Sequence, residues 1–142
     1  MSIYSLGLNS TVTTIAASAM DILAASTNSP KLMELGVNLG AATVSTYGLG
    51  RAGNTPVQTS GVAVLAEGLD TNVGLSKLAV AWGTAPTVPT NFFRRISLPA
   101  TVGSGVIWTF PRGLVIAASA AMELWNIATN SASVNAHWVV DE

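Results

Sequence analysis

Residues 33–39, which read MELGVNL, decide the fold class. Apolar residues occupy every second position of this stretch, and Glu, Gly and Asn fill the positions between them. Because successive side chains of a β-strand point to opposite faces of the sheet, this alternation predicts a strand with one buried face.

Further short apolar or alternating runs follow this stretch, and in the C-terminal half they recur about every 8–12 residues, a spacing typical of a β-sandwich or barrel. The predicted strands are residues 43–49, 62–66, 78–82, 92–98, 106–110, 114–116, 121–127 and 134–140. The sequence PRG at residues 111–113 predicts a break between two of them. No amphipathic helix longer than two turns is evident in the sequence. We therefore predict an all-β fold, in the form of a two-sheet β-sandwich of jelly-roll type.

The run FFRRISL, which ends at Leu98, contains a conflict between alternation and charge. Strict alternation places Phe92 and Ile96 on one face of the strand and Phe93 on the other. Arg94 then falls on the face of Phe92 and Ile96. Either its head group escapes at an edge of the sheet or the predicted register is wrong.

The first 30 residues differ from the rest of the chain, since they are rich in Ser, Thr, Ala and Asn and carry one charge, Asp21. The β-branched run at residues 11–15 favours an extended chain, whereas residues 16–25 fit a helix as well as a strand. We predict a strand and an extended N-terminal arm over residues 1–30, followed by the β-sandwich domain over residues 31–142.

The composition restricts the possible partners of this 142-residue chain, whose length fits one domain. Charged residues make up 9% of the chain and the formal net charge is −1. This balance offers little attraction to nucleic acid or to an anionic membrane, whereas depletion of Lys, Glu and Asp is typical of subunit interfaces. The chain has no cysteine, no continuous apolar run of the length a spanning helix needs, and no basic residue before Lys31. We expect no disulfide, no membrane span and no export signal.

The sequence GLGRAG at residues 48–53 matches the dinucleotide-binding pattern G-x-G-x-x-G, with Asp70 near the position of a ribose-binding carboxylate. That chemistry requires a helix that opens at the glycines, so that its amide groups meet the pyrophosphate. Residues 54–56 read NTP and predict more loop instead. We interpret the motif as a glycine-rich turn that leads into a loop over residues 50–61, and we expect no cofactor.

The single histidine, His137, could in principle join a serine and Asp21, Asp70 or Asp141 in a catalytic triad. The chain lacks the G-x-S-x-G motif, and His137 is opposite in phase to Trp138 in an alternating strand. We predict that His137 faces solvent or an interface. One histidine and scattered carboxylates also show no metal-ligand spacing.

Glu123 is opposite in phase to Met122 and Leu124. We predict a charged residue on a half-exposed strand face. Glycoside hydrolysis would need two carboxyl groups across a cleft, and the sequence does not place two such groups. We therefore expect a protein that is not an enzyme.

The four tryptophans, Trp82, Trp108, Trp125 and Trp138, allow two interpretations. Exposed aromatic faces could bind carbohydrate, but large aromatic side chains more often fill a core or a subunit interface, which we favour.

Arg94 and Arg95 form the one basic doublet, with Arg51 and Arg112 elsewhere. Arginine pairs well with carboxylates at interfaces. We expect inter-subunit pairing with acidic residues of another copy, for which the candidates are Glu123, Asp141 and Glu142. The candidate interface residues are Arg94, Arg95, Trp108, Arg112, Trp125 and Trp138.

Four segments carry a family resemblance: LAVAWGTAPTVP at residues 78–89, RRISLPATVGSGVIWTFP at residues 94–111, LWN at residues 124–126 and WVVDE at residues 138–142. They resemble small structural proteins of tailed bacteriophages, including the capsid decoration or cement proteins, and the resemblance covers residues 32–142.

The resemblance implies a β-rich trimer on the capsid surface of the virion, at threefold or quasi-threefold positions, made in the host cytoplasm. Its partners would be the major capsid protein and other copies of itself, an extended terminal arm would grip neighbouring subunits, and no catalytic residues are implied. The alternative is a carbohydrate- or host-binding module of a phage head or tail fibre.

Overall fold

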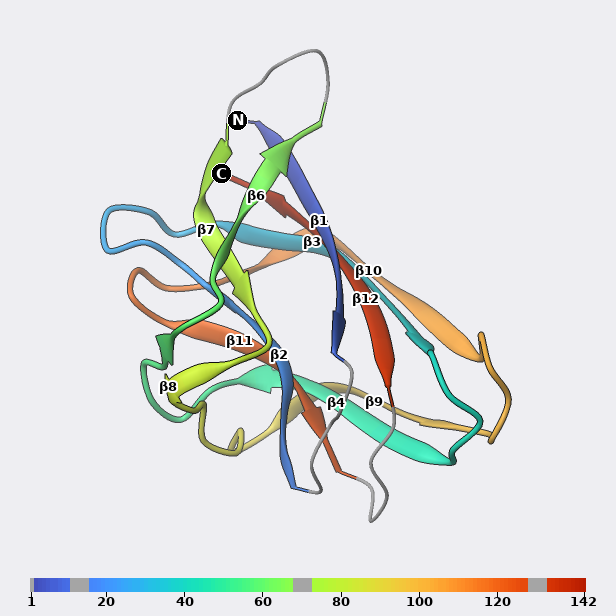
Figure 1. Cartoon of the computed structure of the whole chain (residues 1–142). Helices are drawn as coiled ribbons and strands as arrows, with labels where there is room; N and C mark the ends of the chain where they lie inside the picture. The colour runs from blue at the N-terminus through green and yellow to red at the C-terminus, as the bar shows by residue number, and fades with distance from the viewer. Residues whose placement is uncertain (1, 11–15, 68–72, 128–132) are drawn as a thin grey trace.

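The computed structural model describes residues 2–10, 16–67, 73–127 and 133–142 (Figure 1). Within these ranges the chain forms twelve β-strands and no helix, which confirms the predicted all-β class. The strands are β1 (Ile3–Ser10), β2 (Ala17–Leu23), β3 (Lys31–Leu39), β4 (Ser45–Arg51), β5 (Val57–Gln58), β6 (Val62–Ala66), β7 (Val73–Ala79), β8 (Trp82–Thr84), β9 (Phe92–Leu98), β10 (Gly105–Val115), β11 (Ala121–Asn126) and β12 (Val134–Asp141).

Ten of the strands form a single antiparallel sheet in the order β10-β3-β12-β1-β6-β7-β2-β11-β4-β9, and β5 pairs with β8 in a separate two-stranded sheet. The large sheet curls until its two edge strands approach each other. The Arg94 guanidinium of β9 lies 5.3 Å from the centre of the Phe110 ring of β10. The sheet is therefore nearly closed around one core, and the jelly-roll connectivity stays a prediction.

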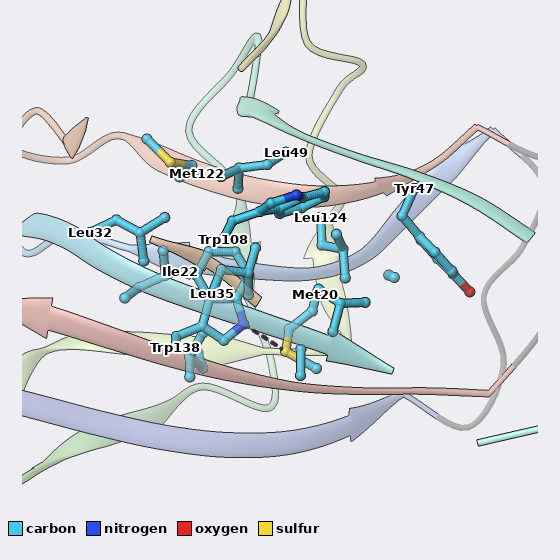
Figure 2. Close-up of a cluster of buried hydrophobic side chains, with 14 of the residues drawn as sticks. Met20, Ile22, Leu32, Leu35, Tyr47, Leu49, Trp108, Met122, Leu124 and Trp138 are labelled. Carbon is cyan, nitrogen blue, oxygen red and sulfur yellow. Dashed lines mark hydrogen bonds between the residues drawn. The ribbon is translucent and has the colours of Figure 1, made fainter. Parts of the chain in front are cut away.

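The core lies inside this curled sheet and draws side chains from strands far apart in the sheet order (Figure 2). Trp138 of β12 is fully buried, and its Nε1 donates to Sδ of Met20 of β2 at 3.1 Å. This contact crosses the core, because three strands separate β12 from β2 in the sheet. The other large, fully buried side chains are Ile22, Leu32, Leu35, Leu39, Tyr47, Leu49, Leu78, Ile116, Met122 and Leu124.

The described part of residues 1–30 belongs to the sheet. β1 lies between β12 and β6, and β2 lies between β7 and β11. Both strands are thus interior strands of the same fold as residues 31–142, and neither projects from it as an arm. The ambiguous residues 16–25 contain a strand, whereas residues 11–15 lie outside the described part of the chain.

Two irregularities separate the observed strands from the predicted ones. The predicted runs 106–110 and 114–116 form one strand, β10, with a register shift against β3 between Thr109 and Leu114. Gly113 allows this bulge, because its φ of +67° is unfavourable for other residues. The predicted break at residues 111–113 is therefore a local distortion that does not end the strand.

A second register shift, between β4 and β9, resolves the conflict at Arg94. Phe93 and Ile96 pack against the core, whereas Phe92 packs against Gly48 on the other face. The predicted grouping of Phe92 with Ile96 is wrong, because the bulge reverses the phase of the strand. Arg94 is exposed at the sheet edge, which is the first of the two alternatives that the sequence left open for this residue.

Candidate functional site

Asp21 of β2 and Glu123 of β11 form a buried pair on the outer face of the sheet. They are direct register partners, and neither has exposed surface. Their chain neighbours Met20, Ile22 and Met122 point into the core. Because side chains alternate along a strand, the two carboxyl groups point away from the core and share the opposite face of the sheet.

A small flap lies against this face of the sheet and contacts Asp21 of β2 and Lys77 of β7. We define the flap as residues 54–61 and 80–87, which contain β5 and β8. The pairing of β5 with β8 joins its two halves. Two further hydrogen bonds connect them: the Thr59 amide donates to the Ala81 carbonyl oxygen at 3.1 Å, and the Thr87 amide donates to Oδ1 of Asn54 at 2.8 Å. β8 is labelled at the lower left of Figure 1.

The flap contacts the carboxyl pair through two hydrogen bonds to one atom. Trp82 Nε1 donates to Oδ1 of Asp21 at 2.9 Å, and Gln58 Nε2 donates to the same oxygen at 3.0 Å. Among the described residues, Oδ2 of Asp21 and both carboxyl oxygens of Glu123 have no hydrogen-bond partner. Buried polar atoms normally have partners. Seven buried side-chain atoms of the described residues lack one, and four of them gather here: these three oxygens and Oε1 of Gln58 in the flap.

Burial governs the electrostatics of the pair. It raises the pKa of Asp21 to about 6, against the opposing effect of the hydrogen bonds from Trp82 and Gln58. It also raises the pKa of Glu123 to about 8, and the negative charge of Asp21 adds to this rise. The nearby Ser18 hydroxyl opposes the rise, although in this structure it donates to the Met20 carbonyl oxygen at 3.3 Å. At neutral pH the site therefore favours a protonated Glu123 beside an ionised Asp21.

The prediction that Glu123 lies on a half-exposed face is wrong. The predicted phase is right, since Glu123 is opposite to Met122 and Leu124, which lie in the core, but the face to which it points is also buried. Sequence reasoning did not connect Gln58, Trp82 and Asp21 with Glu123. No local pattern signals this group, because its members come from four separate segments of the chain.

Neither carboxyl group of the pair has surface exposed to solvent. A cavity of about 300 Å³ is lined by residues that include Leu23, Leu75, Lys77 and Ser119, but by neither carboxyl group. Within the described ranges, no three His, Asp or Glu side chains come together as a metal site would require.

His137 lies on the outer face at the other end of the sheet, where its Nε2 is 2.9 Å from Oε1 of Glu34. The side chains of His137 and Glu34 are 44% and 34% exposed. A row of amides crosses the same face: Asn9 Nδ2 donates to Oδ1 of Asn135 at 2.8 Å, and Asn135 Nδ2 donates to Oδ1 of Asn38 at 3.2 Å. This end of the sheet is thus polar and open to water, as predicted for His137.

The tryptophans do not form an exposed platform. Trp138 has no exposed surface, Trp108 and Trp125 are each 8% exposed, and Trp82 is partly buried over Asp21. Trp108, Trp125 and Trp138 therefore offer almost no surface to another subunit or to a sugar. Trp108 and Trp138 belong to the core, which agrees with the interpretation of the tryptophans as core residues for these two.

The candidate interface arginines, Arg94, Arg95 and Arg112, are exposed. The three acidic residues considered as their partners differ in position. Asp141 is partly buried. Glu123 is buried, and the Glu142 carboxylate accepts the backbone amides of Leu75 and Ser76 at 2.8 and 2.9 Å. Glu142 thus has a structural contact within its own chain.

The glycine motif also has a structural explanation. Gly48 and Gly50 lie in β4, so the predicted turn is wrong at these two positions. A Cβ atom at Gly48 would lie 2.5 Å from Cδ1 of Phe92, so glycine here admits an aromatic ring against the strand. No helix follows the motif in the described chain, which leaves it without the helix N-terminus that a pyrophosphate site requires.

Comparison with known proteins identifies no relative: no family model and no curated protein matches this chain. In the part of the chain that the structure describes, no helix is long and apolar enough to cross a bilayer.

Proposed function

We propose that this protein is a structural protein of a tailed-phage virion, which binds the outside of the capsid and reinforces contacts between major capsid protein subunits. The resemblance of residues 32–142 to phage decoration proteins supports this proposal, as does the low content of charged residues, 9%. The rigid, nearly closed sheet suits a protein that bridges neighbours. We further propose that it acts as a homotrimer.

The observation that carries the proposal is an exposed apolar face on β1, β6 and β7. We define it by Ile3, Leu65, Val73 and Leu75, whose exposed fractions lie between 37% and 59%. Leu65 pairs in register with Ser5 of β1 and with Val73 of β7, so these side chains share the outer face of adjacent strands. Grouped exposed aliphatic residues of this kind are typical of a surface that another protein covers.

The energetic argument is that a capsid-binding protein needs contact area. Burial of apolar surface contributes roughly 25 cal/mol per Å² before the cost of association is subtracted. Exposed aliphatic side chains on three adjacent strands supply such area without the desolvation of charges.

The test is addition of the purified protein to expanded capsids that lack it, with bound copies counted and the thermal resistance of the particles measured. We expect stoichiometric binding and raised resistance. The double variant Leu65→Asp, Leu75→Asp should lose binding, because it places two charges in the contact surface. Val102→Asp is the matched control, since Val102 is 63% exposed in the loop between β9 and β10.

A protein that leaves capsids unchanged contradicts the proposal, and so does equal binding by the double variant and the wild type. Light scattering on the free protein tests the trimer. Replacement of Arg94 and Arg95 by Ala should weaken the oligomer if these exposed arginines contribute to its interface.

A further inference from the structure

The three unpartnered oxygens of the buried pair need a chemical explanation. Directly opposed residues on antiparallel strands have Cβ atoms about 4.5–5.5 Å apart. Asp21 and Glu123 occupy such positions, with no exposed surface on either. Two ionised carboxylates this close in a buried site repel each other strongly, and burial itself disfavours each charge.

No positive charge on the surrounding strands compensates the pair within the described chain. Lys77 on the neighbouring β7 is exposed, and its contact with the flap is through its backbone carbonyl, which accepts from Gln58. Arg51 on β4 donates to the Val115 carbonyl oxygen and lies over the Phe93 ring. β5 and β8 contain no titratable side chain.

We propose that Glu123 holds a proton in the folded protein and donates it to Oδ2 of Asp21, and that loss of this proton releases the flap from the sheet. One donated proton gives a partner to Oδ2 of Asp21 and to one of the two Glu123 oxygens. The Asp21 carboxylate then accepts from Trp82 and Gln58 on one oxygen and from Glu123 on the other.

The flap is the part of the fold that would move. Its strands are two and three residues long and pair only with each other, whereas β2 and β11 each pair along the ten-stranded sheet. Two of its side-chain contacts with the sheet end on the same Asp21 oxygen. Ionisation of Glu123 places a second negative charge beside that oxygen, and admission of water under the flap is the smallest structural change that solvates it.

The pH at which this happens follows from burial, which raises the pKa of Glu123 to about 8. The flap should therefore be closed at neutral pH and open at alkaline pH. The cavity beside the flap, lined in part by Thr55, Leu75 and Ser119, would widen when the flap lifts.

The experiment follows the indole N–H signals of the full chain by ¹⁵N NMR between pH 6 and pH 9.5, with the Trp82 signal assigned by its absence from Trp82→Phe. We expect the Trp82 signal to shift or broaden with a midpoint near pH 8. The Trp138 indole, which donates to Met20 in the core, is the internal control and should not follow this transition. In Glu123→Gln, which keeps a donor but cannot ionise, the Trp82 transition should disappear.

A second measurement does not depend on any variant folding. In the wild-type chain with ¹³C-labelled glutamate carboxyl groups, one carboxyl carbon should titrate near pH 8. The proposal is overturned if all glutamate carboxyls titrate below pH 5, or if Glu123→Gln keeps the Trp82 transition. A midpoint that moves on addition of Mg²⁺ or Ca²⁺ would also overturn it, because the pair would then hold a cation in place of the proton.

Discussion

The two ends of the sheet each place an acidic side chain beside a second titratable group on the outer face, yet the two pairs have opposite environments. Glu34 and His137 lie open to water and contact each other at 2.9 Å, whereas Asp21 and Glu123 lie under the flap with no exposed surface. Neighbouring antiparallel strands present the groups in both places: Asp21 and Glu123 are direct register partners, whereas Glu34 and His137 are diagonal neighbours on β3 and β12. The two places differ in whether the flap covers them. Water solvates the exposed Glu34 carboxyl, whereas a bound proton neutralises the Glu123 carboxyl under the flap.

The most direct test of this difference between the two pairs is to remove one acidic side chain from each. Asp21→Ala leaves the Trp82 and Gln58 donors and the Glu123 carboxyl without their partner, and should lower the free energy of unfolding by about 3–5 kcal/mol. Glu34→Ala at the exposed end should lower it by less than about 1 kcal/mol. Urea unfolding of both variants at pH 6.5 measures the difference. Equal losses would show that the flap does not isolate the buried pair.

The next largest effect is the dependence of stability on pH. The pKa values of about 6 for Asp21 and about 8 for Glu123 lie above the ordinary values of 3.8 and 4.5. Between the ordinary and the raised values the folded state binds protons that the unfolded chain releases, so stability falls as pH rises. A carboxyl group whose pKa is higher by one in the folded state than in the unfolded chain changes the free energy of unfolding by about 1.4 kcal/mol.

We therefore expect the protein to lose several kcal/mol of stability between pH 4 and pH 8, the larger part through Glu123, and to lose little more from this pair above that range. Denaturant unfolding at pH 4, 5, 6.5, 8 and 9 provides the measurement. A free energy of unfolding that rises steadily over this range would contradict the raised pKa values.

Glu123→Gln should change the free energy of unfolding at neutral pH by less than Asp21→Ala does. It tests whether the charge of Glu123 causes the difference between the buried and the exposed pair. Its amide can still donate to Asp21, so we expect a change of less than about 1.5 kcal/mol at pH 6.5. The variant should gain on the wild type as pH rises from 5 to 8, because the unfolded wild-type chain releases the Glu123 proton and the amide has none to release. Glu34→Gln is the matched control and should leave the slope of stability against pH between pH 6 and pH 8 unchanged. A wild-type slope in Glu123→Gln would assign the pH dependence to another group.

The smallest effect is expected at the exposed histidine. His137→Ala removes the contact with Glu34 and should cost about 0.2–1 kcal/mol, with a smaller loss at high salt. Thermal unfolding at low and high ionic strength measures it. A loss as large as that of Asp21→Ala would mean that exposure does not weaken this pair.

Prediction from the sequence succeeded where one strand carries its own signal. The bounds of β6 and β9 match the predicted runs 62–66 and 92–98, because short apolar or alternating runs reflect local burial. It failed at bulges, where one extra residue in β9 reverses the faces of Phe92 and Phe93 without any change in composition. The interface role predicted for the tryptophans stays a prediction, and Trp138 lies fully inside the core.

The candidate site shows the same limit more clearly. Alternation correctly placed Glu123 opposite to Met122 and Leu124. A pattern of period two, however, shows only on which face of the strand a residue lies. It does not report whether another segment covers that face. The covering residues, Gln58 and Trp82, are 65 and 41 positions away from Glu123 along the chain.

The sequence by itself determined the all-β class, most of the strands and the absence of thiol chemistry, since these depend on composition and on neighbouring residues. The tertiary structure alone decided that residues 3–10 and 17–23 are interior strands, that the sheet nearly closes, and that Asp21 meets Glu123 beneath a flap. The physical reason is that pairing between strands and exclusion of water depend on contacts between distant segments. Those contacts turned two ordinary carboxyl groups into a pair with strongly raised pKa values.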